Sequence, residues 1–163
     1  MNVPTGIQEI LKSRPPGLAV LNALNRLLEN DEYLLRVDAN ERSISFRFGM
    51  YLQEELPQYS VDCEFNRTGI DPKRIDYDLS EASIGDTEGR TVFPDVVAHV
   101  RGRRDNYLVI ELKKSNSTVS RSFDLQKLRG YKKDEGLSYK YALFLVVAVG
   151  EEPGVACAQW VDD

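Results

Sequence analysis

Two acidic residues and a lysine stand where they could serve one reaction centre. Asp95 lies in the apolar run 93–97, Glu111 and Lys113 lie in the run 109–113, and a short basic link containing a glycine separates the runs. If the runs form an antiparallel hairpin centred near residue 103, Asp95 and Glu111 face each other with Cβ atoms about 4.5–5.5 Å apart. Because side chains alternate along a strand, Lys113 shares the face of Glu111. The pattern predicts that the three side chains converge.

Two carboxylates that face each other imply a cation between them. At a separation of about 5 Å and an effective dielectric near 20, the two charges repel by about 3 kcal/mol. A divalent cation held by oxygen ligands removes this penalty. The pairing of Asp95 with Glu111 therefore predicts a metal site. The alternative is a hairpin register shifted by one residue, which sends Glu111 to the other face and leaves the acids solvated.

The composition is typical of one globular domain. Of the 163 residues, 42% are hydrophobic and 29% are charged, which excludes a disordered chain, and this length can bury a core without disulfides. The longest apolar run, residues 141–149, is much shorter than the ~18 residues that a membrane helix needs. The first residues lack the basic stretch and apolar core of a secretory signal. We therefore expect a single cytoplasmic domain, 1–163, with no membrane partner.

Neither the two cysteines nor the single histidine forms a recognisable metal or redox motif. Cys63 and Cys157 lie far apart and lack a CxxC partner, so we expect reduced, partly buried thiols. His99 shares the face of Asp95 and lies opposite Tyr107 in the symmetric hairpin register. A structural role and a secondary role in the site both remain open for this histidine.

Positive charge is concentrated in one stretch of the chain. The net charge is −5, yet residues 101–140 hold eleven Lys and Arg against five Asp and Glu, so this stretch is near +6 and the remainder near −11. A basic surface on an acidic protein suits a polyanion that is bound at one place. The residues expected to contact backbone phosphates are Arg101, Arg103 and Arg104 at the hairpin tip, Lys114, and Lys127 on the following helix. For the helix, a solvated face is the alternative.

Apolar periodicity predicts an alternation of helices and strands. The expected helices are 5–12, 18–28, about 40–56 and 123–135, and the expected strands outside the hairpin are 59–67, 140–149 and 155–160. Residues 33–37 are expected to form a connector, and residues 68–90 a long surface loop with a short strand near 75–79. The second helix carries a leucine stripe suited to packing or to a dimer interface: Leu18, Leu21, Leu24, Leu27 and Leu28.

A third acid accompanies the apolar stripe of the helix that precedes the first strand. Glu41 lies three residues before Ile44, which belongs to that stripe. It is either an inward-pointing ligand or the N3 residue of a capping box with Asp38 at the N-cap; Asn40 is the other candidate cap. The weaker candidates for a third acid are Glu55 and Glu64, and for Glu64 a solvated strand face is the commoner explanation.

The order helix, strand, strand, strand, helix, strand, with Pro94-Asp95 in one strand and Glu111-Leu112-Lys113 in the next, resembles the PD-(D/E)xK nuclease superfamily. The resemblance covers about residues 40–149 and extends to uncharacterised bacterial and phage-type members. It implies an α/β, restriction endonuclease-like fold with an αβββαβ core and a mixed central sheet flanked by helices. The corresponding segments are a helical extension (1–37), the core (38–149) and a C-terminal strand (150–163).

The same resemblance implies roles for the site residues. Asp95, Glu111 and Glu41, with the backbone carbonyl of Leu112, would hold one or two Mg²⁺ ions, with Mn²⁺ as a substitute. Lys113 would orient or deprotonate the attacking water and steady the charge on the phosphate. Because burial and neighbouring charges act on its pKa in opposite directions, its role as a base stays open.

The leading interpretation is a Mg²⁺-dependent nuclease that hydrolyses phosphodiester bonds, with DNA as the expected substrate. The alternative is a non-catalytic module that keeps the nuclease fold and binds nucleic acid or protein through its basic stretch. The opposition of Asp95 and Glu111 favours the enzyme, because a binding module has little physical reason to retain that repulsion. A homodimer that places two sites on one duplex is also open.

Overall fold

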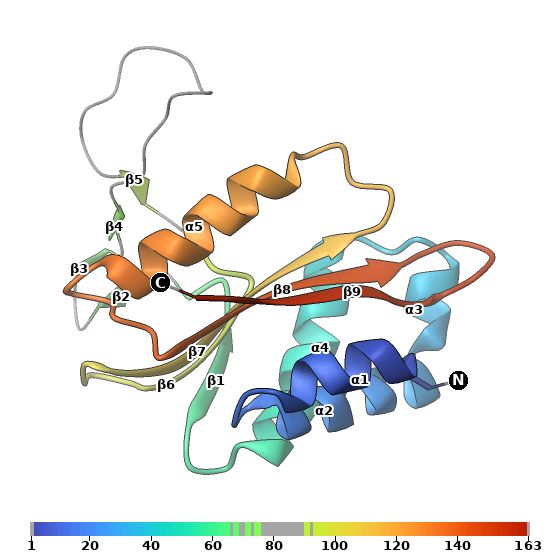
Figure 1. Ribbon diagram of the computed structural model, residues 1–163, viewed down its shortest axis with the longest axis horizontal. Helices are drawn as coiled ribbons and strands as arrows, with labels where there is room; N and C mark the ends of the chain where they lie inside the picture. The colour runs from blue at the N-terminus through green and yellow to red at the C-terminus, as the bar shows by residue number, and fades with distance from the viewer. Residues whose placement is uncertain are drawn as a thin grey trace.

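The computed structural model describes residues 2–65, 67–68, 71–72, 74–75, 90–91 and 93–162. Its α/β class agrees with the expectation: a five-stranded, mixed, open sheet has helices on both faces (Figure 1). The helices are α1 (Thr5–Lys12), α2 (Gly17–Asn30), α3 (Glu32–Arg36), α4 (Glu41–Glu55) and α5 (Arg121–Lys133). The strands are β1 (Ser60–Cys63), β2 (Arg67–Thr68), β3 (Asp71–Pro72), β4 (Arg74–Ile75), β5 (Arg90–Thr91), β6 (Val96–Val100), β7 (Asp105–Lys114), β8 (Tyr141–Ala148) and β9 (Gly154–Val161).

The main sheet has the strand order β1-β6-β7-β8-β9. Strands β7 and β8 are parallel and are joined through α5, whereas the other neighbours are antiparallel. In the β6–β7 hairpin, Val96 pairs with Ile110 and Val97 pairs with Val109. This register is centred on residue 103, as predicted, and it continues to place Asp95 across from Glu111. The shifted register is therefore excluded.

The hairpin departs from the predicted symmetry near its tip. A bulge between Ala98 and His99 makes His99 pair with Asn106, so the expected pairing of His99 with Tyr107 is wrong. The extra residue is Tyr107, which turns its ring to stack on Tyr59 at a centroid distance of 4.4 Å. The bulge also lets the buried Asn106 donate its Nδ2 to the carbonyl of Leu137 at 2.6 Å. A single inserted residue thus re-aims two side chains.

One face of the sheet is covered by α1, α2 and α4 (Figure 1). The leucine stripe of α2 is buried there within the chain itself, except that Leu18 is 58% exposed, contrary to expectation. Leu18 lies about 120° around the helix from Leu24, outside the face that meets α4 and the sheet. The stretch 33–37, expected as a connector, belongs mostly to α3.

The opposite face of the sheet is covered by α5. Leu128 and Tyr131 of this helix pack with Val97, Val109 and Phe144 of the sheet in a second core. Because side chains alternate along β7, this is also the face toward which Glu111 and Lys113 point. Helix α5 is therefore the element that closes over the predicted site.

The long segment expected as a surface loop is described only in part. Residues 67–68 pair with 71–72, and residues 74–75 pair with 90–91, as two short antiparallel ladders. The strand predicted near 75–79 lies, apart from its first residue, outside the described residues. Among the helices of the described ranges, none combines the length and the apolar character needed to cross a membrane.

Helix α4 lies unusually close to the edge strand β1 at Gly49. A Cβ at this position would lie 2.9 Å from the Sγ of Cys63, whereas a Cβ at Gly6 in α1 would meet nothing within 4 Å. Glycine inside a helix costs about 1 kcal/mol relative to alanine. The close approach of the two elements explains why glycine occupies position 49.

We predict that Gly49→Ala gives none of the roughly 1 kcal/mol that alanine normally adds to a helix, because the new Cβ forces Cys63 to move. In a Cys63→Ala background the same change should raise the free energy of unfolding by about 1 kcal/mol. Chemical denaturation of the four proteins measures this coupling. Gly6→Ala is the control, with equal effects in both backgrounds. Equal effects of Gly49→Ala in the two backgrounds would contradict the close contact.

Candidate functional site

The start of α4 brings its first residue to the end of β7. Asn40 is the N-cap, and its side chain accepts a hydrogen bond from the Ser43 N–H at 2.8 Å. Glu41 is thereby released from a capping role: its Oε1 accepts from Lys113 Nζ at 3.2 Å and its Oε2 accepts from the Lys114 N–H at 3.4 Å. Of the two alternatives for Glu41, the geometry supports the inward-pointing one.

Asp95 and Glu111 lie on adjacent strands at the end of the hairpin opposite its tip. Asp95 directly precedes β6, and its Oδ2 accepts from the Leu112 N–H at 2.8 Å. Because the N–H and C=O of a strand residue point to the same side, the Leu112 carbonyl is also directed toward Asp95. Glu111 is fully buried, and its Oε2 accepts from Lys127 Nζ at 2.8 Å. The predicted trio therefore does converge, with Glu41 beside it.

A fourth acid, Asp124 of α5, completes the cluster and was missed by the sequence analysis. Asp124 is 1% exposed, and its Oδ1 lies 3.7 Å from Lys113 Nζ and 3.8 Å from Lys127 Nζ. The signal was present in its spacing: Asp124 lies four residues before Leu128 and seven before Tyr131, which places it on the buried stripe of α5.

Two buried carboxylate oxygens of this cluster have no hydrogen-bond partner among the described residues. They are Oε1 of Glu111 and Oδ2 of Asp124, and the buried hydroxyl of Tyr131 likewise lacks a well-formed hydrogen bond. Tyr131 and Glu111 nevertheless lie close enough to interact as hydrogen-bond partners, and the glutamate, after burial as the main cause, raises the pKa of the phenol. Buried carboxylate oxygens that lack a hydrogen-bond donor suggest a further binding partner, such as a cation coordinated by oxygen atoms.

Burial sets the electrostatics of three of the acids. It raises the pKa of Asp95 to about 6, against the lowering influence of the Leu112 N–H and the two lysines. It also raises the pKa of Glu111 well above the ordinary value, with Asp95 adding to the effect, and it raises the pKa of Asp124. These three carboxyls are therefore held in places that disfavour their charge.

The two lysines respond in the opposite way. Burial lowers the pKa of Lys113, but the surrounding carboxylates outweigh it and leave that pKa raised. The same balance, with Glu111 as the main partner, raises the pKa of Lys127. Both ammonium groups are thus cationic at neutral pH. With all six groups ionised, the cluster carries a formal charge of −2, which one divalent cation would neutralise.

The donor chemistry of this cluster fits a hard divalent cation. Its donors are carboxylate oxygens, two of them unpartnered, and Mg²⁺ and Mn²⁺ prefer such ligands. The acids are not, however, gathered as a closed cage: within the described ranges no three or more His, Cys, Asp or Glu are grouped at metal-binding distances. The ammonium groups of Lys113 and Lys127 lie between the acids instead.

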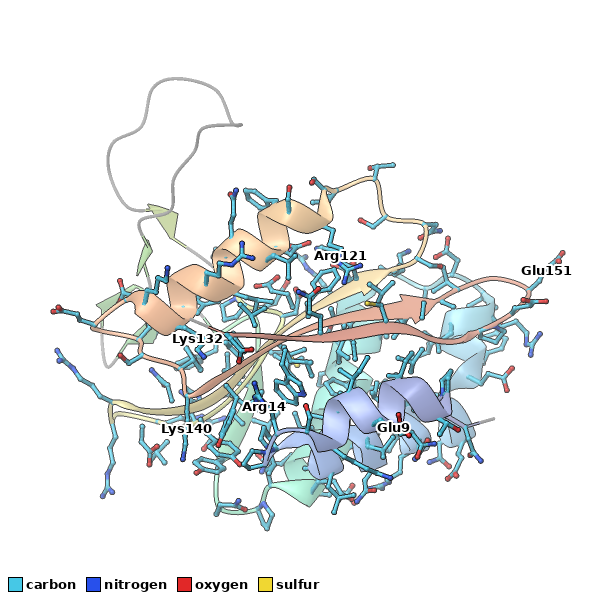
Figure 2. The ribbon with its side chains drawn as sticks, viewed as in Figure 1. Glu9, Arg14, Arg121, Lys132, Lys140 and Glu151 are labelled. Carbon is cyan, nitrogen blue, oxygen red and sulfur yellow. The ribbon has the colours of Figure 1, made fainter. Side chains whose placement is uncertain are left out.

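The residues expected to bind phosphate are scattered. Lys127 lies inside the cluster rather than on the solvent face of α5, and Lys114 donates to Asp38 Oδ1 at 2.8 Å. Arg101 is paired with Asp62. Arg103 and Arg104 are exposed at the hairpin tip, about 20 Å along β6 from the acids. Figure 2 shows further basic side chains, Arg121 and Lys132, along α5, with Lys140 near the start of β8.

The remaining sequence candidates lie outside the cluster. Glu55 accepts from Asn22 at the far end of α4, about 21 Å from Glu41. Glu64 is exposed and pairs with Arg42 at 2.8 Å. His99 is buried, lies edge-on to Phe65 and shares Asp62 with Arg101 at an Nε2–Oδ2 distance of 2.8 Å. The geometry therefore favours the structural role for this histidine.

Comparison with known proteins gives no family assignment: no family model, no curated protein and no solved structure matches the chain.

We predict an unusual pH dependence of stability in the presence of a chelator. Because the folded-state pKa of Asp95 is about 6, above its ordinary value of 3.8, the folded state binds the proton more tightly than the unfolded state. The free energy of unfolding should therefore rise as pH falls from 7.5 to 5. Asp95→Asn should be more stable than wild type at pH 7.5 by about 1–3 kcal/mol and should lose part of this dependence. Urea denaturation at each pH measures both effects.

The control for this prediction is Asp162→Asn. Asp162 is an exposed acid whose pKa is lowered by Arg14, so its loss should not stabilise the protein at pH 7.5. An Asp95→Asn variant that is less stable than wild type at that pH would show that the carboxyl is not strained by burial.

Proposed function

We propose that this protein is a metal-dependent nuclease that hydrolyses phosphodiester bonds, with DNA as its substrate, on a restriction endonuclease-like core. Along the chain, the main-sheet strands and the helices beside them follow the order α4, β1, β6, β7, α5, β8, which supports that core. The acids and the lysine occupy adjacent strands at one end of the sheet, as the PD-(D/E)xK pattern requires. The proposal takes the motif as Pro94-Asp95 and Glu111-Leu112-Lys113.

The observation that carries the proposal is the position of the partly buried Asp95 across from the fully buried Glu111, beside carboxylate oxygens that lack a well-formed hydrogen bond. This arrangement disfavours folding in the absence of a cation, since burial raises the pKa of both acids. In a protein that only binds a partner, nothing would offset this loss of folding free energy. In a nuclease it is offset, because a divalent cation held here neutralises the acids and the phosphate that is attacked.

The residues that would hold Mg²⁺ or Mn²⁺ are Asp95, Glu111 and Glu41, with the Leu112 carbonyl on the same side. When bound, the metal supplies Lewis-acid activation of water and neutralisation of charge on the phosphate. Asp124 is a further acid within reach of the same lysines. The carboxylates also orient the two ammonium groups that face the reacting phosphate.

Lys113 is suited to stabilise charge rather than to abstract a proton. Its pKa is raised by Asp124, Asp95 and Glu41, so it is protonated at neutral pH. In the hydrolysis, the water oxygen forms a bond to phosphorus, one P–O ester bond breaks, and the proton lost by water is balanced by protonation of the leaving oxygen. The Lys113 ammonium would hold the charge that builds on the non-bridging oxygens. Lys127 Nζ donates to Glu111 Oε2 at 2.8 Å and holds that carboxyl in place.

We predict that Glu111→Gln, Asp95→Asn and Lys113→Met each lower the rate of Mg²⁺-dependent cleavage of DNA by at least about 100-fold. The first two remove a metal-binding charge without a change of shape, and the third removes the ammonium group. Cleavage of labelled single-stranded and duplex DNA under single-turnover conditions measures the loss, with Mn²⁺ as a second metal.

The matched controls are Glu54→Gln and Lys12→Met. Glu54 is an exposed acid of α4 paired with Arg26, and Lys12 is exposed at the end of α1, so both variants should cut at the wild-type rate. Thermal unfolding should show that all variants are folded. A wild-type protein that cleaves no nucleic acid with either metal would overturn the proposal, as would full activity of Glu111→Gln.

A further inference from the structure

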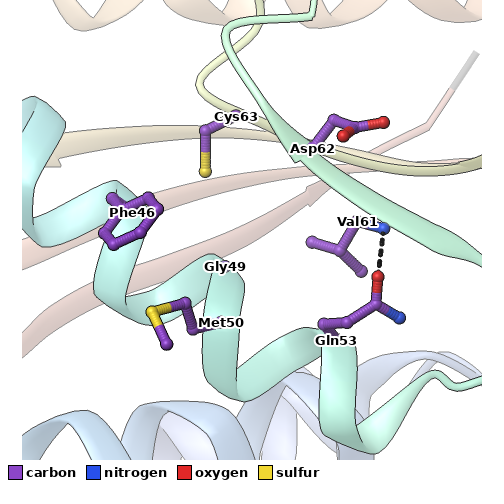
Figure 3. A pocket seen from close by; sticks show the side chains of 7 residues that line it. All are labelled: Phe46, Gly49, Met50, Gln53, Val61, Asp62 and Cys63. Carbon is purple, nitrogen blue, oxygen red and sulfur yellow. Dashed lines mark hydrogen bonds between the residues drawn. The ribbon is translucent and has the colours of Figure 1, made fainter.

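A groove runs along α4 away from the candidate site. Residues 42, 45, 46, 49, 50 and 53 follow the spacing of one helix face, and this face is turned toward β1. A cavity of about 450 Å³ lies between them, lined by Phe46, Gly49, Met50, Gln53, Val61, Asp62 and Cys63 (Figure 3). A second cavity of about 220 Å³ is lined by Arg42, Ser45, Phe46, Cys63, Glu64 and Asp95. Both cavities are lined by Phe46 and Cys63, so they lie next to each other along α4, and the inner one reaches Asp95.

The walls of the outer cavity are apolar and accessible. Phe46 is 57% exposed and Met50 is 43% exposed, although both lie on a helix that is otherwise well packed. Figure 3 shows both side chains beside the cavity, with the sulfur of Cys63 directed toward the helix and the carboxylate of Asp62 directed away from it. Gly49 lies at the base of the cavity, where a Cβ would meet the Sγ of Cys63. An exposed aromatic face beside a cavity is a platform for a flat ligand.

The polar groups around the groove are mostly engaged by the chain itself. The amide of Gln53 donates to the carbonyl of Tyr59 at 2.8 Å and accepts from the Val61 N–H at 2.9 Å. This bond occupies an outward-facing N–H of the edge strand β1, which opposes the addition of a peptide strand there. By contrast, the Oγ of Ser45 is buried and makes no hydrogen bond to any described residue. Ser45 lines the inner cavity, although its hydroxyl oxygen is itself covered.

We propose that this groove binds an unpaired nucleobase of the substrate strand, stacked on Phe46, so that the substrate is single-stranded or carries an unpaired segment at the cut. The inference rests on the proposed function for the place of the scissile phosphate near Asp95. A base fits the apolar walls and the aromatic face, and proteins bind single strands by stacking bases on such side chains. The volume of the outer cavity, about 450 Å³, lies within the range of small-molecule sites.

The junction of the two cavities also suits the sugar-phosphate chain. Arg42 is highly exposed at this point, and its Nε donates to Glu64, itself an exposed acid, at 2.8 Å. Exposed ion pairs contribute little stability, so the guanidinium can exchange the carboxylate for a phosphate. A strand whose base lies on Phe46 would therefore pass Arg42 on its way to the acids. A duplex with all its bases paired offers no free base face to the groove.

The test compares binding of a labelled single-stranded oligothymidylate with binding of an abasic strand of equal length and charge, by fluorescence anisotropy in chelator. Wild type should bind the base-containing strand about 5- to 100-fold more tightly, the range expected for loss of base stacking. Phe46→Ala should lose this preference, and Phe46→Trp should keep it. Tyr33→Ala is the matched control, since Tyr33 is an aromatic residue of α3 that is 72% exposed and lies outside both cavities; it should bind as wild type does.

Equal binding of the two strands by wild type, or an unchanged preference in Phe46→Ala, would overturn the groove as a base site. Cleavage of single-stranded and duplex DNA in Mg²⁺, measured on the same proteins, separates this inference from the nuclease proposal. Cleavage without any base preference would leave the nuclease and refute the groove. A base preference that depends on Phe46, without cleavage in Mg²⁺ or Mn²⁺, would keep the groove and refute the nuclease.

Discussion

The gathering of four carboxylates, two of them fully buried, with only two ammonium groups is the constraint on which the rest of the structure depends. Glu41, Asp95, Glu111 and Asp124 come from four different elements, and each is placed where its charge is disfavoured or shared. Lys113 and Lys127 offset part of the repulsion, but a formal charge of −2 remains when all six groups are ionised. A buried charge that is not compensated is costly. This uncompensated charge is the physical basis on which we propose that the site receives a cation.

The fold supplies this site through a few precise contacts. The β6–β7 hairpin sets Asp95 against Glu111, the Asn40 cap starts α4 so that Glu41 reaches Lys113, and α5 closes the face of the sheet with Asp124. The two apolar cores on either side of the sheet hold these elements in place. Helix α4 has a double role, because Glu41 at its start faces the acids while Phe46, five residues on, faces the groove.

Local sequence patterns predicted the features that depend only on the symmetric register of a hairpin or on the apolar stripe of one helix. The opposition of Asp95 and Glu111 followed from counting residues about the hairpin centre, and the helix over Glu41–Glu55 followed from its apolar stripe. The predicted pairing of His99 was wrong because a bulge adds one residue to β7. Counting residues from the turn cannot show where a bulge shifts the register. Leu18 was wrong because the stripe of α2 is narrower than its leucines suggested.

The features that were missed depend on tertiary packing. Asp124 was not singled out, and Lys127 was expected to contact phosphate or to lie on a solvated face of its helix, since nothing local distinguishes a solvated polar side from one that covers another strand. Only the docking of α5 on β7 brings Lys127 to Glu111 and Asp124 to Lys113. The same holds for the groove, which exists because Gly49 lets α4 approach β1. The pattern that identified Glu41, an acid on the apolar stripe of a predicted helix, would also have found Asp124.

The central claim is that these carboxylates form a site for a divalent cation, and calorimetric titration of the protein with Mn²⁺ tests it most directly. At pH 7.5 the account predicts saturable binding of one or two ions to wild type, strong weakening of that binding in Glu111→Gln, and weaker binding at pH 5, where protons compete for Asp95. No saturable heat with wild type, or the same binding in Glu111→Gln, would contradict the account.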